Sequence, residues 1–248
     1  MPELISFTIL FIVGVVAGII NIMAGGGSTL TLPALIFLGV DPSVANGTNR
    51  IAILMQNVSA LASFKRDKVT EIKKSLKYAL LTIPGVIAGG YTAVKISDDL
   101  FEKILAVVLI FIIFSFIFKP KSLSIGEDNK YRNWILYPSF ILIGFYGGFI
   151  QVGVGFLIMG VLYHLSDMTL LKVNVHKVFI ILFYTVFAIV IFNFSGNINW
   201  FLGIGLAAGN TVGGFFGAKF TVKGGEKYIK YALVAAVIII VLKLLNIV

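Results

Sequence analysis

Ten hydrophobic segments separated by short polar turns make up almost the whole of this 248-residue chain. Hydrophobic residues are 58% and charged residues 12% of the composition, and several segments reach the roughly 20 apolar residues that span a bilayer. A soluble catalytic domain has no room in such a chain. The pattern predicts an all-α membrane protein folded as one bundle. The segments are 4–22, 28–39, 44–64, 76–95, 100–118, 134–151, 155–166, 174–194, 198–220 and 227–246.

Two glycine-rich stretches interrupt this pattern at matching places. One reads Ala-Gly-Gly-Gly-Ser at 24–28 and the other Gly-Val-Gly at 153–155. The segment after each is short, and at ~1.5 Å per residue it reaches roughly half of a ~30 Å hydrocarbon core. Short glycine-broken segments at equivalent positions of two halves indicate a transporter binding site near the membrane midplane.

The two halves of the chain resemble each other. We predict a first five-segment repeat at 1–118, a cytoplasmic linker at 119–133 and a second repeat at 134–248. Because five is odd, the second repeat enters the membrane from the opposite side, which makes the repeats inverted. The first two segments of each half are expected to form broken or re-entrant short helices. The matches include Gly14 with Gly144, Gly18 with Gly148, Asn21 with Gln151, Gly25 with Gly155 and Asn46 with Asn174.

Loop charges give the orientation. If the loop at 65–77 is cytoplasmic, successive crossings of the membrane also place the linker, the turn at 166–177 and the loop at 219–230 inside the cell. These regions hold 16 of the 20 Lys and Arg residues, as the positive-inside rule requires. Both termini are then predicted to lie outside. The net charge of +9 is explained by loops beside anionic lipid, and no nucleic-acid partner is expected.

The glycine stretch at 25–27 is a candidate binding loop. Glycine lets the backbone approach a ligand closely, Ser28 is expected to cap the short helix that follows, and a helix N-terminus attracts anions. The alternative is tight helix packing. Packing is the preferred explanation for Gly14 with Gly18 and Gly144 with Gly148, which have small-xxx-small spacing.

A second set of polar residues follows each short segment. Asn-Gly-Thr-Asn-Arg at 46–50 and Asn-Val-His-Lys at 174–177 open long apolar helices. A cation entering the apolar zone is costly unless it faces a cavity or a partner, so Arg50 and Lys177 are candidates for binding an anion. They could instead be interfacial anchors, and Asp41 and Asp167 on the preceding turns are possible partners.

The absences are also informative. The chain has no cysteine and two histidines, so no metal or other cofactor is expected. No Asp or Glu lies in the middle of a long apolar segment, which leaves ion coupling without support. No nucleophile, base and acid are arranged for catalysis, so the chain is predicted not to be an enzyme.

These motifs together resemble the TauE/SafE sulfite-exporter family of permeases. The resemblance rests on Gly-x-x-Asn-x-x-Ala-Gly-Gly-Gly-Ser at 18–28, the stretches at 46–50 and 174–178, and Gly-Gly-Phe-Ile-Gln-x-Gly-x-Gly at 147–155. It implies a multi-pass protein of the prokaryotic inner membrane that moves small sulfur-containing anions such as sulfite, sulfoacetate or other sulfonates. Export is the family's namesake direction, although the direction for this chain stays open.

The expected mechanism is alternating access around a midplane site, with the tight glycine crossings as pivots. The alternative is a passive anion channel, or a permease for another small organic anion. The expected partners are the substrate and the lipid bilayer, and the small-residue faces suit a homodimer and internal packing equally. The candidate substrate-binding residues are Asn21, Gly25, Gly26, Gly27, Ser28, Thr48, Asn49, Arg50, Gln151, Gly153, Gly155, His176 and Lys177.

Overall fold

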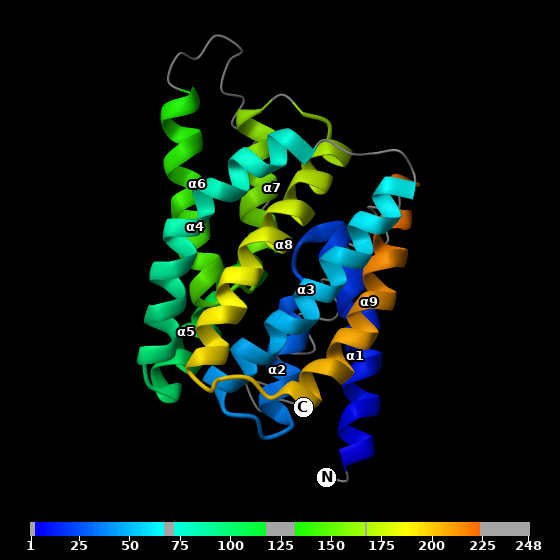
Figure 1. Cartoon of the computed structure of the whole chain (residues 1–248), viewed down its shortest axis with the longest axis vertical. Helices are drawn as coiled ribbons and strands as arrows, with labels where there is room; N and C mark the ends of the chain where they lie inside the picture. Colours follow the sequence, from blue (N-terminus) through cyan, green and yellow to red (C-terminus); the bar gives the residue numbers. More distant parts are fainter. Residues whose placement is uncertain (1–2, 67–71, 118–131, 167, 224–248) are drawn as a thin grey trace.

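The computed structural model describes residues 3–66, 72–117, 132–166 and 168–223, and every regular element within these ranges is an α-helix (Figure 1). Helices occupy nine of the ten segments expected from the sequence. The tenth, 227–246, and residues 119–131 of the linker lie outside the described residues. The helices are α1 (Glu3–Ala24), α2 (Ser28–Phe37), α3 (Pro42–Arg66), α4 (Ile72–Lys95), α5 (Asp98–Ile117), α6 (Arg132–Phe149), α7 (Val154–Leu165), α8 (Leu170–Phe194) and α9 (Trp200–Val222).

The outer surface of the bundle is suited to lipid. Three of the described helices are long and apolar enough to cross a membrane: Leu4–Ala24, Leu170–Phe194 and Trp200–Val222. Large apolar side chains point outward along several helices, including Phe111, Leu142 and Phe194, each at least 70% exposed. Such a surface would be unfavourable in water and is favourable against hydrocarbon chains.

The fourth helix of each half packs against the other half of the sequence. α1 lies along α9, and α3 also packs on α9; correspondingly, α6 lies along α4, and α8 also packs on α4 (Figure 1). α2 contacts α1 and α3, while α7 contacts α6 and α8. The described helices therefore form two groups, which we call the α1–α9 group (α1, α2, α3, α9) and the α4–α6 group (α4, α6, α7, α8). They meet mainly where α3 contacts α8.

Glycines bring the helix backbones together inside each group. A Cβ atom on Gly14 would lie 2.7 Å from the carbonyl oxygen of Leu206, and one on Gly18 would lie 2.9 Å from that of Asn210. In the other group, a Cβ on Gly144 would collide with the Thr82 backbone. The packing explanation for these small-xxx-small glycines is confirmed, because any side chain would force the helices apart.

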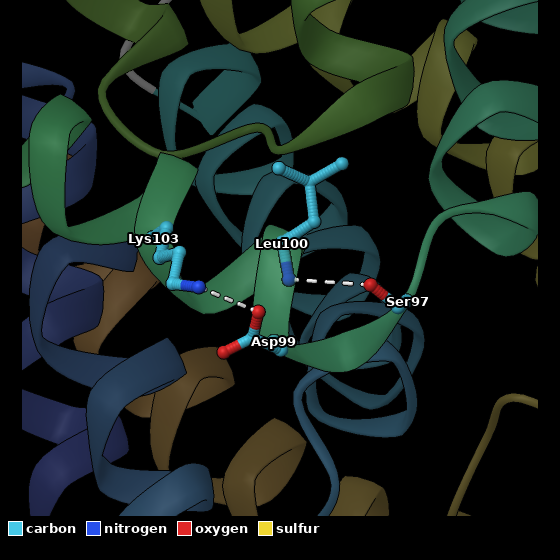
Figure 2. Close-up of polar contacts among 4 residues, drawn as sticks. All are labelled: Ser97, Asp99, Leu100 and Lys103. Carbon is cyan, nitrogen blue, oxygen red and sulfur yellow. Dashed lines mark hydrogen bonds and ion pairs between the residues drawn. The ribbon is translucent and has the colours of Figure 1, made fainter.

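α5 begins at the same end of the bundle as α3. The Asp98 carboxylate accepts a hydrogen bond of 2.9 Å from the backbone N–H of Ser43, at the start of α3. In the first turn of α5, the Ser97 hydroxyl oxygen accepts from the Leu100 N–H, and Lys103 forms an exposed ion pair of 2.7 Å with Asp99 (Figure 2). A pocket of about 370 Å³ opens between α2 and the part of α5 from Asp99 to Leu109. None of the candidate substrate-binding residues lines that pocket.

Candidate functional site

The two glycine breaks meet inside the bundle. α1 ends at Ala24 and α2 begins at Ser28, while α6 ends at Phe149 and α7 begins at Val154. Gly25, with φ of +91°, packs directly against Gly155, so that a Cβ on Gly25 would lie 2.6 Å from the Gly155 carbonyl carbon. The N-termini of two short helices from opposite halves of the sequence are thereby brought to one place.

The second break uses left-handed backbone at two positions. Gly153, the N-cap residue of α7, has φ of +72°, which suits glycine. Gln151 has φ of +62° and is the one residue other than glycine, among those the structure describes, with a left-handed backbone. Its side-chain N–H donates to the Thr185 hydroxyl over 3.3 Å. Strained backbone of this kind persists only where the surrounding structure holds it.

The cap of α2 differs from the expectation. Gly27 is the N-cap residue and Ser28 is the first helical residue, so the prediction that Ser28 caps the helix is wrong. The cap function is taken by Asn21 at the end of α1, whose side-chain oxygen accepts from the Gly27 N–H over 3.2 Å. An acceptor from the preceding helix replaces a local one because Gly27 packs closely against Ala17 and Asn21.

Arg50 is completely buried and donates its hydrogen bonds to the end of a helix from the other half. Its Nη1 donates to the Gly147 carbonyl (2.9 Å) and its Nη2 to the Gly148 carbonyl (2.7 Å). These carbonyls belong to the last turn of α6, where no intrahelical N–H is available. The guanidinium also lies 4.4 Å above the ring centroid of Phe192, a cation–π contact.

Lys177 does the same for the other broken helix. Its Nζ donates to the carbonyls of Asn21 (3.2 Å) and Ile22 (2.6 Å), both in the last turn of α1, and contacts the sulfur of Met159. Like Arg50, Lys177 is buried. Each cation thus lies at the negative end of a helix dipole, which partly offsets the cost of burying its charge.

Neither cation has an acidic partner among the described residues. The ion pair formed there joins Lys103 to Asp99 on the surface. Asp41, one of the partners considered from the sequence, is exposed, and Asp167 lies outside the described residues. The breaks are therefore flanked by two buried positive charges that backbone carbonyls, rather than carboxylates, hold in place.

Asn49 lies between Arg50 and the short helix α2. Its side-chain oxygen accepts a hydrogen bond of 2.6 Å from the Thr31 hydroxyl of α2. Its Nδ2 has no hydrogen-bond partner among the described residues, and neither does Nε of Arg50. Both atoms are fully buried donors, and leaving a buried donor unpaired is unfavourable, so these two atoms can accommodate an acceptor from a ligand.

Two of the predicted residues make their hydrogen bonds elsewhere. The Thr48 hydroxyl accepts from the Asn199 N–H (2.9 Å), which ties α3 to the turn before α9. His176 Nδ1 lies 2.7 Å from the Ser75 hydroxyl, toward α4 rather than toward the breaks.

Three contributors escaped the sequence analysis. Thr31 follows Ser28 and Thr29 in the apolar helix α2, Thr185 directly follows Tyr184 in α8, and Phe192 is one of many phenylalanines. Hydroxyls that interrupt apolar runs were the only available signal for the threonines, and that signal is weak. Phe192 has no signal at all, because its role comes from its position beneath Arg50.

Comparisons with known proteins agree on one family. A family model described as "Sulfite exporter TauE/SafE" matches residues 10–244. The probable membrane transporter protein ORF9 of Sinorhizobium sp. is 30% identical over 237 residues, covering 95% of this chain and 91% of that protein. The probable membrane transporter protein YfcA of Escherichia coli K12 is 27% identical over 241 residues, covering 96% and 88%. YunE of Bacillus subtilis, with the same description, is 25% identical over 250 residues, covering 90% and 92%. No solved structure matches the chain.

Proposed function

The chain belongs to the sulfite exporter TauE/SafE family of membrane proteins, and from this premise we propose that it carries small sulfur-containing anions, such as sulfite, sulfoacetate or other sulfonates, across the membrane. The relatives are named as probable membrane transporters, without a substrate. The substrate class and the direction of export are therefore part of the proposal, as is the location in the inner membrane of a prokaryote with both termini outside.

The chemistry of the breaks supports an anionic substrate. Two short helices begin beside the Gly25–Gly155 contact. The N–H groups of Gly27, Thr29, Leu30, Val154 and Phe156 already donate to protein acceptors, so the helix starts offer an anion mainly the N–H groups of Ser28 and Gly155. Asn49 Nδ2 and Arg50 Nε add two unpaired donors, and Arg50 and Lys177 add positive charge. A ligand that only accepts hydrogen bonds satisfies this set, and the sulfonate and sulfite oxygens are acceptors of that kind. Gln151 Oε1 at the second break is an unpaired acceptor, so the proposal is carried by the two donors, Asn49 Nδ2 and Arg50 Nε, beside the buried charge of Arg50.

The pairing of helices supports an inverted repeat. The contacts of α1 with α9 in one group correspond to those of α6 with α4 in the other, as expected if the second repeat is a copy of the first in opposite orientation. In such a transporter, movement of one part of the bundle against the other exposes a fixed central site to each side of the membrane in turn. Transport, rather than catalysis, is the activity that this architecture supports.

The proposal is tested by flux of radiolabelled sulfite and a sulfonate panel into proteoliposomes. We expect saturable flux in the unmodified protein and a rise in KM of about tenfold or more in Asn49→Asp, which places a carboxylate where a donor faces the substrate; one lost charge-assisted hydrogen bond of ~1.5–3 kcal/mol corresponds to that factor.

Asn199→Asp is the matched control for this substitution. Asn199 caps α9 by accepting from the Leu202 N–H, a role that aspartate fills equally well, so its flux should be unchanged. Equal KM values in the two variants would remove Asn49 from the site. Absence of flux for every anion tested would overturn the substrate class.

A passive anion channel is the second candidate function. The described carboxylates of α5, on Asp98, Asp99 and Glu102, are exposed, so the described helices offer no buried acidic side chain for coupling to protons or sodium. Counterflow distinguishes the two candidates. A carrier preloaded with unlabelled sulfite accelerates uptake of labelled sulfite, whereas a channel does not.

A further inference from the structure

The contacts within each group of helices differ from the contacts between the two groups. Within each group, glycines place one helix backbone directly against another: Gly209 and Gly213 on the backbone of α1, and Gly85 and Gly89 on that of α6. Tightly interlocked backbones have a single packing arrangement and do not slide past each other by small steps. The glycine crossings are thus the rigid parts of the bundle.

The boundary between the groups is bridged by the Gly25–Gly155 contact at the breaks and by hydrogen bonds from long side chains. Arg50 reaches from α3 in the α1–α9 group to α6, and Lys177 reaches from α8 in the α4–α6 group to α1. Asn46 also crosses this boundary, donating to the Phe149 carbonyl over 2.8 Å. The hydrogen bonds from long side chains can be exchanged, and the Gly25–Gly155 contact can open, without disrupting either group. Separation of the glycine crossings within a group would disrupt that group.

We infer that the parts that move during transport are the α1–α9 group and the α4–α6 group rather than the two halves of the sequence, and that Arg50 and Lys177 are positioning residues that tether the groups in the arrangement described here. This inference rests on the proposed transport function. The tethers are reciprocal: each group sends one cation to the broken helix of the other. Because those helices precede the short helices α2 and α7, release of a tether would displace the central site directly.

Cross-linking tests the boundary in a chain that contains no native cysteine. The first double variant, Asn174→Cys with Thr221→Cys, joins α8 to α9 across the boundary, since these side chains are 3.3 Å apart. The second, Ser59→Cys with Thr211→Cys, joins α3 to α9 within one group, where the Ser59 hydroxyl donates to the main-chain carbonyl of Thr211 over 2.7 Å. Bridging with a short thiol cross-linker should stop flux in the first variant, reversibly on reduction, and leave it intact in the second. Loss of flux in the second, or full flux in the bridged first, would overturn the inference.

A second measurement does not depend on the substrate. Nitroxide labels at Leu4 and Phe201 lie in different halves but in one group, while labels at Leu4 and Lys95 lie in one half but in different groups; all three side chains are exposed. In electron paramagnetic resonance of the reconstituted protein, the first pair should give one distance and the second pair two populations. Lys177→Met should shift the second pair alone toward the population that is minor in the unmodified protein.

The opposite pattern, a fixed distance for Leu4 with Lys95 and two populations for Leu4 with Phe201, would show that the sequence halves move as units and would overturn the inference. The distances also separate this inference from the proposed function. If no sulfur anion is transported but the group-specific pattern holds, the substrate proposal fails and the moving parts stand. If sulfur anions are carried but the group-specific pattern is absent, the substrate proposal stands and the inference about the moving parts fails.

Discussion

Replacement of Gly155 by alanine is expected to abolish transport and to lower the stability of the protein markedly. A Cβ atom at this position would lie 2.8 Å from the Gly25 carbonyl oxygen and still closer to the Gly25 Cα, so the two breaks would have to separate. The obstacle is backbone and cannot rotate away as a side chain can. Overpacking of this kind costs roughly 1–3 kcal/mol and, at a contact between two helix starts, also displaces the N–H groups proposed to bind substrate.

Gly160→Ala provides the matched control on the same helix. Gly160 has no atom within 4 Å of the position that its Cβ would occupy, and alanine is favoured over glycine in a helix by up to about 1 kcal/mol. The Tm in detergent and the sulfite flux of this variant should equal or exceed those of the unmodified protein. A Gly155→Ala protein with unchanged Tm and flux would show that the two breaks do not need to touch.

Local features of the fold were predictable because they depend on residues close together in sequence. The short helices α2 and α7 follow from glycines that break an apolar run and from polar turns about ten residues later. Their observed bounds, Ser28–Phe37 and Val154–Leu165, lie within two residues of the expected 28–39 and 155–166. The error at the cap of α2 is similarly local: Ser28 has the right chemistry, but Asn21 approaches from the preceding helix and caps Gly27.

The partners of the helices were not predictable from the pattern. An apolar helix with small residues on one face packs equally well on any similar face, so nothing in the sequence assigns α9 to α1 or α4 to α6. The partners of Arg50 and Lys177 escaped for a related reason. The sequence left them as either buried anion-binding cations or interfacial anchors, with carboxylates as possible partners, but the observed acceptors are backbone carbonyls, which every residue has. Only the position of a helix end in space makes a carbonyl available.

Replacement of Lys177 by methionine is expected to reduce sulfite flux by at least about tenfold while changing stability much less. Two effects on the free energy of unfolding oppose each other. Removal of a buried charge relieves its desolvation cost, but it leaves the Ile22 carbonyl unpaired at roughly 1–3 kcal/mol, while the Asn21 carbonyl still accepts from the Gly25 N–H. Transport has no such compensation, because the variant lacks both the positive charge near the breaks and the bridge from α8 to α1.

Three further measurements separate a tether from a purely structural lysine. Lys177→Arg retains a cationic donor and should restore much of the flux, whereas a purely structural defect would be visible as a lowered Tm in both variants. Lys172→Met removes an exposed lysine from the same helix and should leave flux and Tm near their original values, as surface substitutions usually do. Full flux in Lys177→Met, with an unchanged distance between labels at Leu4 and Lys95, would contradict both the electrostatic and the tethering role, since the charge and the cross-group hydrogen bonds would then be dispensable.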